Sequence, residues 1–315
     1  MSTAQIRPVV AVIATGGTIA SKRGEDGAST PTLSGEDLLA LVPDIDADLR
    51  PIDLMAKDSS LLDLTDMQHI SDAVKSALND ADVQGVVVLH GTDAMEETAL
   101  LVHIQQRIAK PVIFTGAQFT ADHPDADGPA NLAHAVQLAI DPANAARGVL
   151  IAFGGRVIPA WGAYKASSDS ADAFHAARSL GTLPSPGLSK PVGASRIDTV
   201  AIYPGCDAVH IEASVAAGAR GIVLAALGSG NATPDVVEAV RRCTQQGIAV
   251  VVSSRVPEGL LTPGYGGGGG GHDLAAAGAI HASTLRPGQA RILLAALIAN
   301  DKPKNAIIRA FSDSQ

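Results

Sequence analysis

The sequence has few cysteines, few aromatic residues and no long hydrophobic run. It holds only two cysteines, Cys206 and Cys243, among 315 residues, which is too few for a zinc ribbon or a disulfide-stapled scaffold. We expect both to be packed free thiols. Aromatic residues make up 3% of the chain, so Ala, Val, Ile and Leu must build the core. The first apolar run, 9–14, is too short to span a bilayer.

The N-terminal segment and the charge balance limit where the protein is expected to be found and which partners it is expected to bind. The segment MSTAQIRP lacks the lysine-rich start, apolar run and cleavage site of an export signal, which predicts a soluble protein of the cytoplasm with no membrane partner. Hydrophobic residues make up 46% of the chain, which excludes wholesale disorder. The 32 acidic and 23 basic residues give a formal charge of −9, which argues against a nucleic-acid partner.

Short apolar runs alternate with longer segments of helical spacing. The runs predict strands at 8–15, 85–90, 111–116, 148–153, 199–204, 221–227 and 248–254. Helices are expected at 94–110, 128–140, 207–217, 234–246 and 287–299. Continuous apolar strands are typical of parallel sheets covered on both faces. The alternation therefore predicts an α/β protein of two domains, each a mostly parallel sheet with flanking helices.

The predicted N-terminal domain, 1–190, is the larger one, and the C-terminal domain covers 199–315. Proline and glycine without periodicity mark 181–198 as the linker. A second irregular stretch, 263–273, contains six successive glycines at 266–271, which we expect to hold neither a helix nor a strand. The sequence leaves open whether this run is a mobile surface loop or a loop that orders over a ligand or a neighbouring subunit.

Hydroxyl and carboxylate groups gather after two of the predicted strands. Thr15 comes right after the last apolar residue of the first strand and precedes two glycines, which allow close approach of a substrate or backbone. Thr92 and Asp93 follow the strand that ends at His90, where ligands bind in open parallel sheets. A second interpretation is structural: Thr15 caps a turn, and Thr92 or Asp93 caps a helix with Glu96 closing a capping box.

Two further segments carry chemistry of less specific kinds. The polar stretch Lys57–Ser60 follows IDLMA (52–56), a possible strand, and by itself indicates a turn. Lys165 lies among apolar residues, where a lysine either extends its ammonium to solvent or has a lowered pKa and acts as a base. The nine histidines show no spacing typical of a metal site, and we expect His90 to be a packed strand-end residue.

Several motifs together resemble the bacterial-type L-asparaginase and glutaminase family. They are ATGGTIAS (14–21), LHGTDAMEETA (89–99), DSS (58–60), TGAQ (115–118), DADGPANL (125–132), FGGRVIPAWGAYK (153–165), GSGN (228–231) and SSRVP (253–257). The resemblance covers nearly the whole chain. It implies hydrolysis of L-asparagine to L-aspartate and ammonia, with no metal and no organic cofactor. It also implies a homotetramer of two intimate dimers, in which the partner's C-terminal domain closes each site.

The resemblance also implies a role for individual residues. Thr15 matches the threonine nucleophile, and Thr92, Asp93 and Lys165 match a second catalytic group that activates it. The matching substrate-binding positions are Asp58, Ser59, Ser60, Gly91, Thr92, Asp93 and Ala117. Among these, Ser59 and its neighbours would bind the α-carboxylate, Asp93 the α-ammonium, and the backbone oxygen of Ala117 the side-chain amide.

The chain departs from the family pattern in three places. The segment 21–39 lacks the tyrosine that often stands beside the nucleophile, and Tyr265 is either a substitute from a partner subunit or a surface residue. Thr233 stands where a second asparagine often follows Asn231. The glycine run replaces a region that often supplies a carboxylate to the neighbouring site; Asp273 and Glu258 are the nearby acidic residues.

Three other functions remain possible from the sequence. One methylene is worth only about 1–3 kcal/mol of discrimination in a pocket, so a glutaminase or a mixed enzyme is an open alternative. A non-catalytic amino-acid sensor is disfavoured, because a binder needs neither two threonines nor a lysine. The glutamine-hydrolysing subunit of a tRNA amidotransferase would need a further N-terminal domain and a basic surface.

Overall fold

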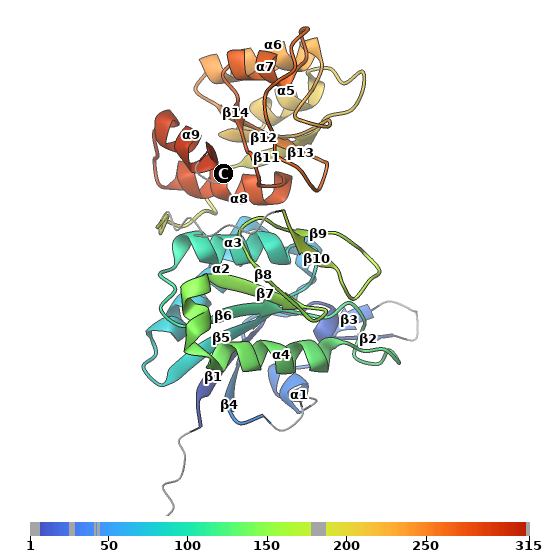
Figure 1. Cartoon of the computed structure of the whole chain (residues 1–315), viewed down its shortest axis with the longest axis vertical. Helices are drawn as coiled ribbons and strands as arrows, with labels where there is room; N and C mark the ends of the chain where they lie inside the picture. Colours follow the sequence, from blue (N-terminus) through green and yellow to red (C-terminus); the bar gives the residue numbers. More distant parts are fainter. Residues whose placement is uncertain (1–6, 25–28, 41, 43–44, 178–186, 313–315) are drawn as a thin grey trace, which may run out of the picture. The chain divides into compact units, whose positions relative to one another are not determined.

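The structure is a computed structural model that describes residues 7–24, 29–40, 42, 45–177 and 187–312. The chain divides between Ala176 and Ala177 into two compact units. The first unit contains a mostly parallel sheet and the second a wholly parallel one, each with helices on both faces (Figure 1). The predicted α/β class is therefore confirmed, with the larger sheet in the N-terminal unit. Part of the predicted linker, 181–186, lies outside the described residues.

A six-stranded sheet forms the centre of the first unit, in the order β4-β1-β5-β6-β7-β8. Its strands are β4 (Asp48–Asp53), β1 (Val9–Ala14), β5 (Val83–Leu89), β6 (Val112–Thr115), β7 (Val149–Phe153) and β8 (Arg156–Pro159). All neighbours pair in parallel except β7 and β8. The register aligns Ala14 with Leu89 and Leu89 with Thr115, so the segments that follow β1, β5 and β6 begin at one edge of the sheet.

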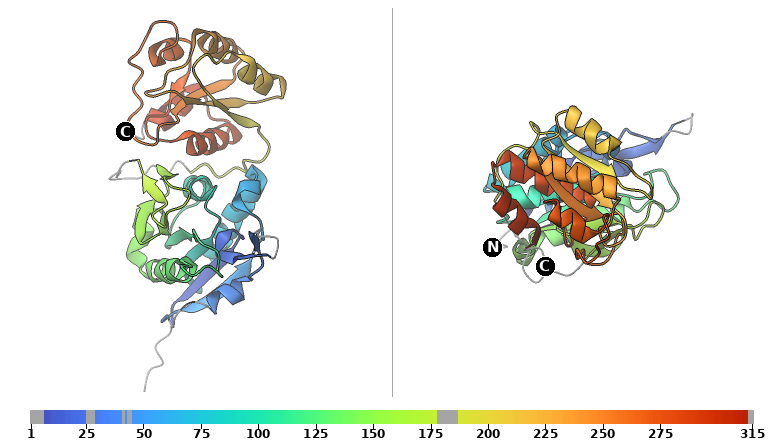
Figure 2. Two further views of the ribbon diagram at one scale, coloured as in Figure 1. Left: turned by 90° about the vertical axis from the view of Figure 1, so that its right-hand side faces the viewer. Right: turned by 90° about the horizontal axis from the view of Figure 1, so that it is seen from above.

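Helices cover both faces of this sheet, as Figure 2 also shows from two further directions. On one face, α2 (Leu64–Asn79) and α3 (Met95–Gln105) share a core with the alternate residues Ile13 and Val88 of β1 and β5. On the other face, α1 (Gly35–Leu39) and α4 (Gly128–Ile140) share a core with Val12 and Leu89. Burial of both faces explains why the central strands are apolar without interruption.

The second unit contains a four-stranded parallel sheet in the order β11-β12-β13-β14. Its strands are β11 (Ile197–Ala201), β12 (Gly221–Ala226), β13 (Ala249–Ser254) and β14 (Ile280–His281). One face packs against α5 (Val209–Ala216), α6 (Pro234–Gln245) and α7 (Gly271–Ala276). Helix α8 (Pro287–Ala299) lies next to β11, β12 and β13, and α9 (Lys304–Ser312) lies next to β14. Cys206 and Cys243 are buried free thiols, as expected.

The structure contains elements that the sequence analysis did not predict. They are the helices α1, α2, α7 and α9, the strands β8, β14 and most of β4, and the hairpins β2–β3 (Ser21–Arg23, Ser29–Pro31) and β9–β10 (Ala163–Lys165, Phe174–Ala176). Short 3₁₀ turns also occur at Thr18–Ala20, Ser59–Leu61 and Pro142–Arg147. The helix expected over 94–110 ends at Gln105, because the backbone of Gln106 is extended, with φ −101° and ψ 145°.

The glycine run departs from the prediction at its last residue. Gly271 is the first residue of α7, so the prediction that none of the six glycines lies in a helix is wrong at this position. The Asp273 carboxylate accepts hydrogen bonds from the N–H groups of Gly268 (2.7 Å) and Gly270 (3.0 Å). Gly269 lies against the turn that follows β12, where its carbonyl accepts a hydrogen bond from Ala232 N (2.8 Å).

Gly85 offers a test of how the first sheet packs. A Cβ atom at this position would lie 2.1 Å from the carbonyl oxygen of Ala139 in α4, so Gly85→Ala forces the helix away from β5. We expect the free energy of unfolding to fall by about 1–3 kcal/mol, measured by denaturant unfolding. The control Gly264→Ala meets no atom within 4 Å and should change stability by less than about 1 kcal/mol. Equal stability of the two variants would contradict this packing.

Candidate active site

Glycines bring three segments of the first unit into contact at the carboxyl ends of β1 and β5. A Cβ atom on Gly16 would lie 2.5 Å from the backbone oxygen of Lys57, and one on Gly17 would lie 2.5 Å from Gly91 Cα. One on Gly91 would lie 2.6 Å from Ser59 Oγ. Gly16 and Gly17 also have φ angles of 100° and 83°, which favour glycine. The predicted site segments 15–18, 57–60 and 90–93 therefore converge.

Lys165 joins this edge from the β9–β10 hairpin and contacts both predicted partners. Its Nζ donates to Thr92 Oγ1 at 2.8 Å and to Asp93 Oδ1 at 2.9 Å. The Lys165 side chain is 20% exposed and that of Asp93 is 60% exposed. The Lys165 ammonium therefore does not lie in a wholly apolar environment, and it does not extend into solvent. It is shared between the hydroxyl of Thr92 and the carboxylate of Asp93.

The capping interpretation of Thr92 and Asp93 is wrong. The residue that precedes α3 is Ala94, and no side chain caps this helix. The backbone N–H of Asp93 instead donates to Ser59 Oγ at 3.0 Å. The side chains of Thr92 and Asp93 are thus directed to Lys165, and Glu96 forms no capping box with them.

Thr15 is held in a different way from Thr92. Its side chain is almost completely buried, and its Oγ1 donates to the carbonyl oxygen of Leu89 at 2.8 Å. The backbone N–H of Thr15 donates to the same oxygen at 3.1 Å. A peptide carbonyl orients the hydroxyl but is too weak a base to remove its proton, so ionisation of Thr15 requires another acceptor.

The remaining predicted binding residues differ in their exposure. Ser59 is 5% exposed and is tied to Asp93 N, whereas Asp58 and Ser60 on either side of it are exposed. Ala117, in the turn after β6, is 1% exposed. Its neighbour Gly116 would place a Cβ atom only 2.3 Å from the carbonyl oxygen of His90. The turn after β6 therefore lies against the segment that carries Thr92 and Asp93.

Two titratable groups beside the site have altered pKa values. Burial raises the pKa of the Glu96 carboxyl from 4.5 to about 8, and the charge of Glu97 acts in the same direction. The ammonium of Lys165 and hydrogen bonds from the backbone of Glu96 and Lys165 oppose this rise. Burial lowers the pKa of His90 from 6.5 to about 4. His90 Nδ1 lies 2.7 Å from Gly91 O, so the neutral ring donates there and packs at the strand end, as expected.

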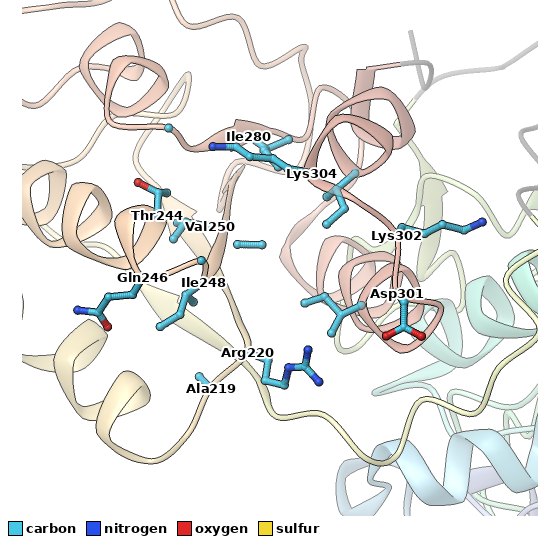
Figure 3. Close-up of a pocket in the computed structure, with 15 residues that line it drawn as sticks. Ala219, Arg220, Thr244, Gln246, Ile248, Val250, Ile280, Asp301, Lys302 and Lys304 are labelled. Carbon is cyan, nitrogen blue, oxygen red and sulfur yellow. The ribbon is translucent and has the colours of Figure 1, made fainter.

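The cavity shown in Figure 3 lies within the second unit and contains none of the predicted site residues. It has a volume of about 620 Å³ and opens at the N-terminal ends of β12 and β13. Charged side chains in its lining come from Arg220, Asp301, Lys302 and Lys304.

Among the residues that the structure describes, there is no group of three or more metal-ligating side chains, and no helix is long and apolar enough to cross a membrane.

Comparison with known proteins gives matches over nearly the entire chain. A model described as "Asparaginase, N-terminal" matches residues 9–185, and one described as "Glutaminase/Asparaginase C-terminal domain" matches 196–311. A probable L-asparaginase of Deinococcus radiodurans is 31% identical over 97% of both chains. A probable periplasmic L-asparaginase of Haemophilus influenzae is 29% identical over 97% of this chain and 93% of that protein.

A solved structure is similar over the same extent. The crystal structure of a probable cytoplasmic L-asparaginase from Campylobacter jejuni superimposes with a TM-score of 0.86 at 26% identity, and covers 97% of this chain and 99% of that one. These matches confirm the family resemblance found in the sequence. They leave the roles of individual residues as predictions.

Glu96 predicts a specific pH dependence of stability. The folded carboxyl keeps its proton up to about pH 8, whereas the unfolded one loses it near pH 4.5. Between these values unfolding releases a proton, so Glu96 makes the free energy of unfolding fall as pH rises. We expect this fall between pH 5 and 8 to be less steep in Glu96→Gln than in the wild type, measured by urea unfolding.

Below pH 6.5 the lowered pKa of His90 makes the free energy of unfolding rise with pH. This effect is the same in the wild type and in Glu96→Gln, so it cancels when their curves are compared. The control is Glu36→Gln, because Glu36 is an exposed glutamate of α1. Parallel curves for wild type and Glu96→Gln would show that the carboxyl of Glu96 is ionised in the folded protein.

Proposed function

Because the chain belongs to the asparaginase and glutaminase family, we propose that it hydrolyses the side-chain amide of L-asparagine to L-aspartate and ammonia. The observation that carries this proposal is the contact of Lys165 with both Thr92 and Asp93, at 2.8 and 2.9 Å. A protein that only binds an amino acid has no need to join a lysine to a threonine hydroxyl in this way. The arrangement therefore favours an enzyme over a sensor.

Thr15 is the proposed nucleophile. Its Oγ1 attacks the amide carbon, the amide nitrogen gains a proton and leaves as ammonia, and water then hydrolyses the threonine ester to release L-aspartate. The hydrogen bond from Oγ1 to Leu89 O fixes the side chain at the end of β1, directly before Gly16 and Gly17. Attack requires Oγ1 to give up that bond and to pass its proton to a stronger base.

Thr92, Asp93 and Lys165 are the proposed proton-transfer group. Thr92 Oγ1 accepts a hydrogen bond from Lys165, so its own proton is free to be donated. The Lys165 ammonium can therefore pass a proton through the Thr92 hydroxyl to the leaving amide nitrogen, and it is reprotonated by the proton that Thr15 gives up. Asp93 orients the Lys165 ammonium from the other side. Because its carboxylate is also 60% exposed, it can pair with the α-ammonium of the substrate at the same time.

Ser59 and Ala117 complete the proposed substrate site. Ser59 Oγ already accepts the N–H of Asp93, so its hydroxyl proton is available for the α-carboxylate of the substrate, with Asp58 and Ser60 beside it. Gly91 allows this close approach, because a Cβ atom there would overlap Ser59 Oγ. The backbone oxygen of Ala117 is the proposed acceptor for the amide N–H of the substrate.

The proposal extends to assembly and location. We place the domains at 1–190 and 199–315, joined by 181–198, in a homotetramer of two dimers. The buried free thiols of Cys206 and Cys243 suit the reducing cytoplasm, although the relatives include proteins named as cytoplasmic and as periplasmic. Catalysis is proposed to need neither metal nor organic cofactor, since threonine, lysine and aspartate supply a nucleophile and a path for the proton.

The proposal is tested by ammonia release from L-asparagine. The wild-type protein should release ammonia and L-aspartate in equal amounts, and Thr15→Ala should lower kcat by at least about 10³-fold. The control Thr65→Ala removes an exposed hydroxyl at the start of α2 and should leave kcat unchanged. Binding of L-asparagine without ammonia release would indicate a sensor, and a Thr15→Ala variant with more than a tenth of the wild-type rate would exclude Thr15 as the nucleophile.

A further inference from the structure

The motif DADGPANL (125–132) at the start of α4 has no role in the mechanism above. Its geometry is unusual for a helix start. Asp127 precedes the helix, at a position where an aspartate ordinarily caps the first turn, yet its carboxylate makes no capping hydrogen bond. Gly128 provides space, since a Cβ atom there would lie 2.8 Å from Ile19 Cγ1. The Asp127 carboxylate is thus held outside its own helix.

The Asp127 carboxylate binds the turn after β6 instead. It accepts hydrogen bonds from the backbone N–H groups of Gln118 and Phe119, each at 3.0 Å. Asn131, one turn later in α4, donates from Nδ2 both to Asp127 and to the carbonyl oxygen of Gly116, again at 3.0 Å. Its Oδ1 accepts the N–H of Gly154 at 3.2 Å, which fixes the orientation of the amide.

These contacts fix the two peptide units on either side of Ala117. A trans peptide unit is planar, and its C=O and N–H point in opposite directions. The unit that contains the Ala117 carbonyl also contains the Gln118 N–H, which Asp127 holds. The preceding unit contains the Gly116 carbonyl, which Asn131 holds. Together, Asp127 and Asn131 therefore set the direction in which the Ala117 carbonyl oxygen points.

The Ala117 carbonyl itself is directed to no group of the protein. Ala117 is 1% exposed, but within the described part of the chain no hydrogen-bond donor contacts its oxygen. A buried carbonyl without a donor is destabilising, and native structures contain few of them. Its neighbour Gly116 lies against His90 O, which places this acceptor next to the turn that carries Thr92 and Asp93.

We propose that Asp127 and Asn131 are positioning residues that direct the Ala117 carbonyl oxygen at the amide nitrogen of the substrate, and thereby make the enzyme selective for amides over esters. The inference rests on the proposed function. An amide presents an N–H that the oxygen can accept, whereas the oxygen of an ester in the same place would face it with lone pairs and no proton. A correctly aimed carbonyl therefore favours the amide substrate specifically.

The test compares L-asparagine with the β-methyl ester of L-aspartate. Both reactions consume one water and form L-aspartate, with ammonia or methanol as the other product, so one assay of L-aspartate serves for both. We expect Asp127→Ala and Asn131→Ala to lower the ratio of kcat/KM for amide over ester by about tenfold, the value of one lost hydrogen bond. Asp127→Asn keeps one acceptor oxygen and should give a smaller decrease.

The matched control is Asp125→Ala, because Asp125 is an exposed carboxylate in the same loop and its removal should leave the ratio unchanged. If Asp127→Ala fails to fold, the ratios of Asp127→Asn and Asn131→Ala decide the question. Equal losses for both substrates, or an unchanged ratio, would overturn the inference and leave a purely structural motif. A wild-type protein that hydrolyses neither substrate would instead contradict the proposed function.

Discussion

The close approach of three backbone segments at one edge of the first sheet is the constraint on which the candidate site depends. Parallel strands β1 and β5 end in register, but side chains would normally keep the following turns apart. Gly16, Gly17 and Gly91 remove that obstacle, since a Cβ atom on any of them would overlap a neighbouring segment. The site is therefore built first from backbone contacts, and its hydroxyl groups are positioned as a consequence.

Much of this architecture could be predicted from local sequence. The helix 128–140 has the predicted bounds because Pro129 fits the first turn of a helix. The buried strands were recognisable because both of their faces are covered. In contrast, α2 was missed although the sequence carries its signals: Met67, Ile70 and Val74 recur at helical spacing, and Asp63 and Asp66 form a capping box at the helix start.

The contacts of the site could be predicted only in part. The resemblance indicated that Thr92, Asp93 and Lys165 act together, but 72 residues separate Asp93 from Lys165, and no spacing rule places a hairpin beside a helix start. The same limit explains the error at the start of α3, where Thr92 or Asp93 was expected to cap the helix and Glu96 to close a capping box. Thr92 and Asp93 instead contact Lys165, whose hairpin no local pattern could place there.

The central claim is that Lys165 acts through Thr92, and a double-mutant cycle on kcat/KM for L-asparagine tests it most directly. Lys165→Met keeps the length of the side chain, and Thr92→Val keeps its shape. If the two residues form one proton path, each single variant loses at least about 10³-fold, and the double variant loses less than about tenfold more than the worse of the two. Losses that multiply in the double variant would contradict the account, because they would show that Lys165 and Thr92 contribute independently.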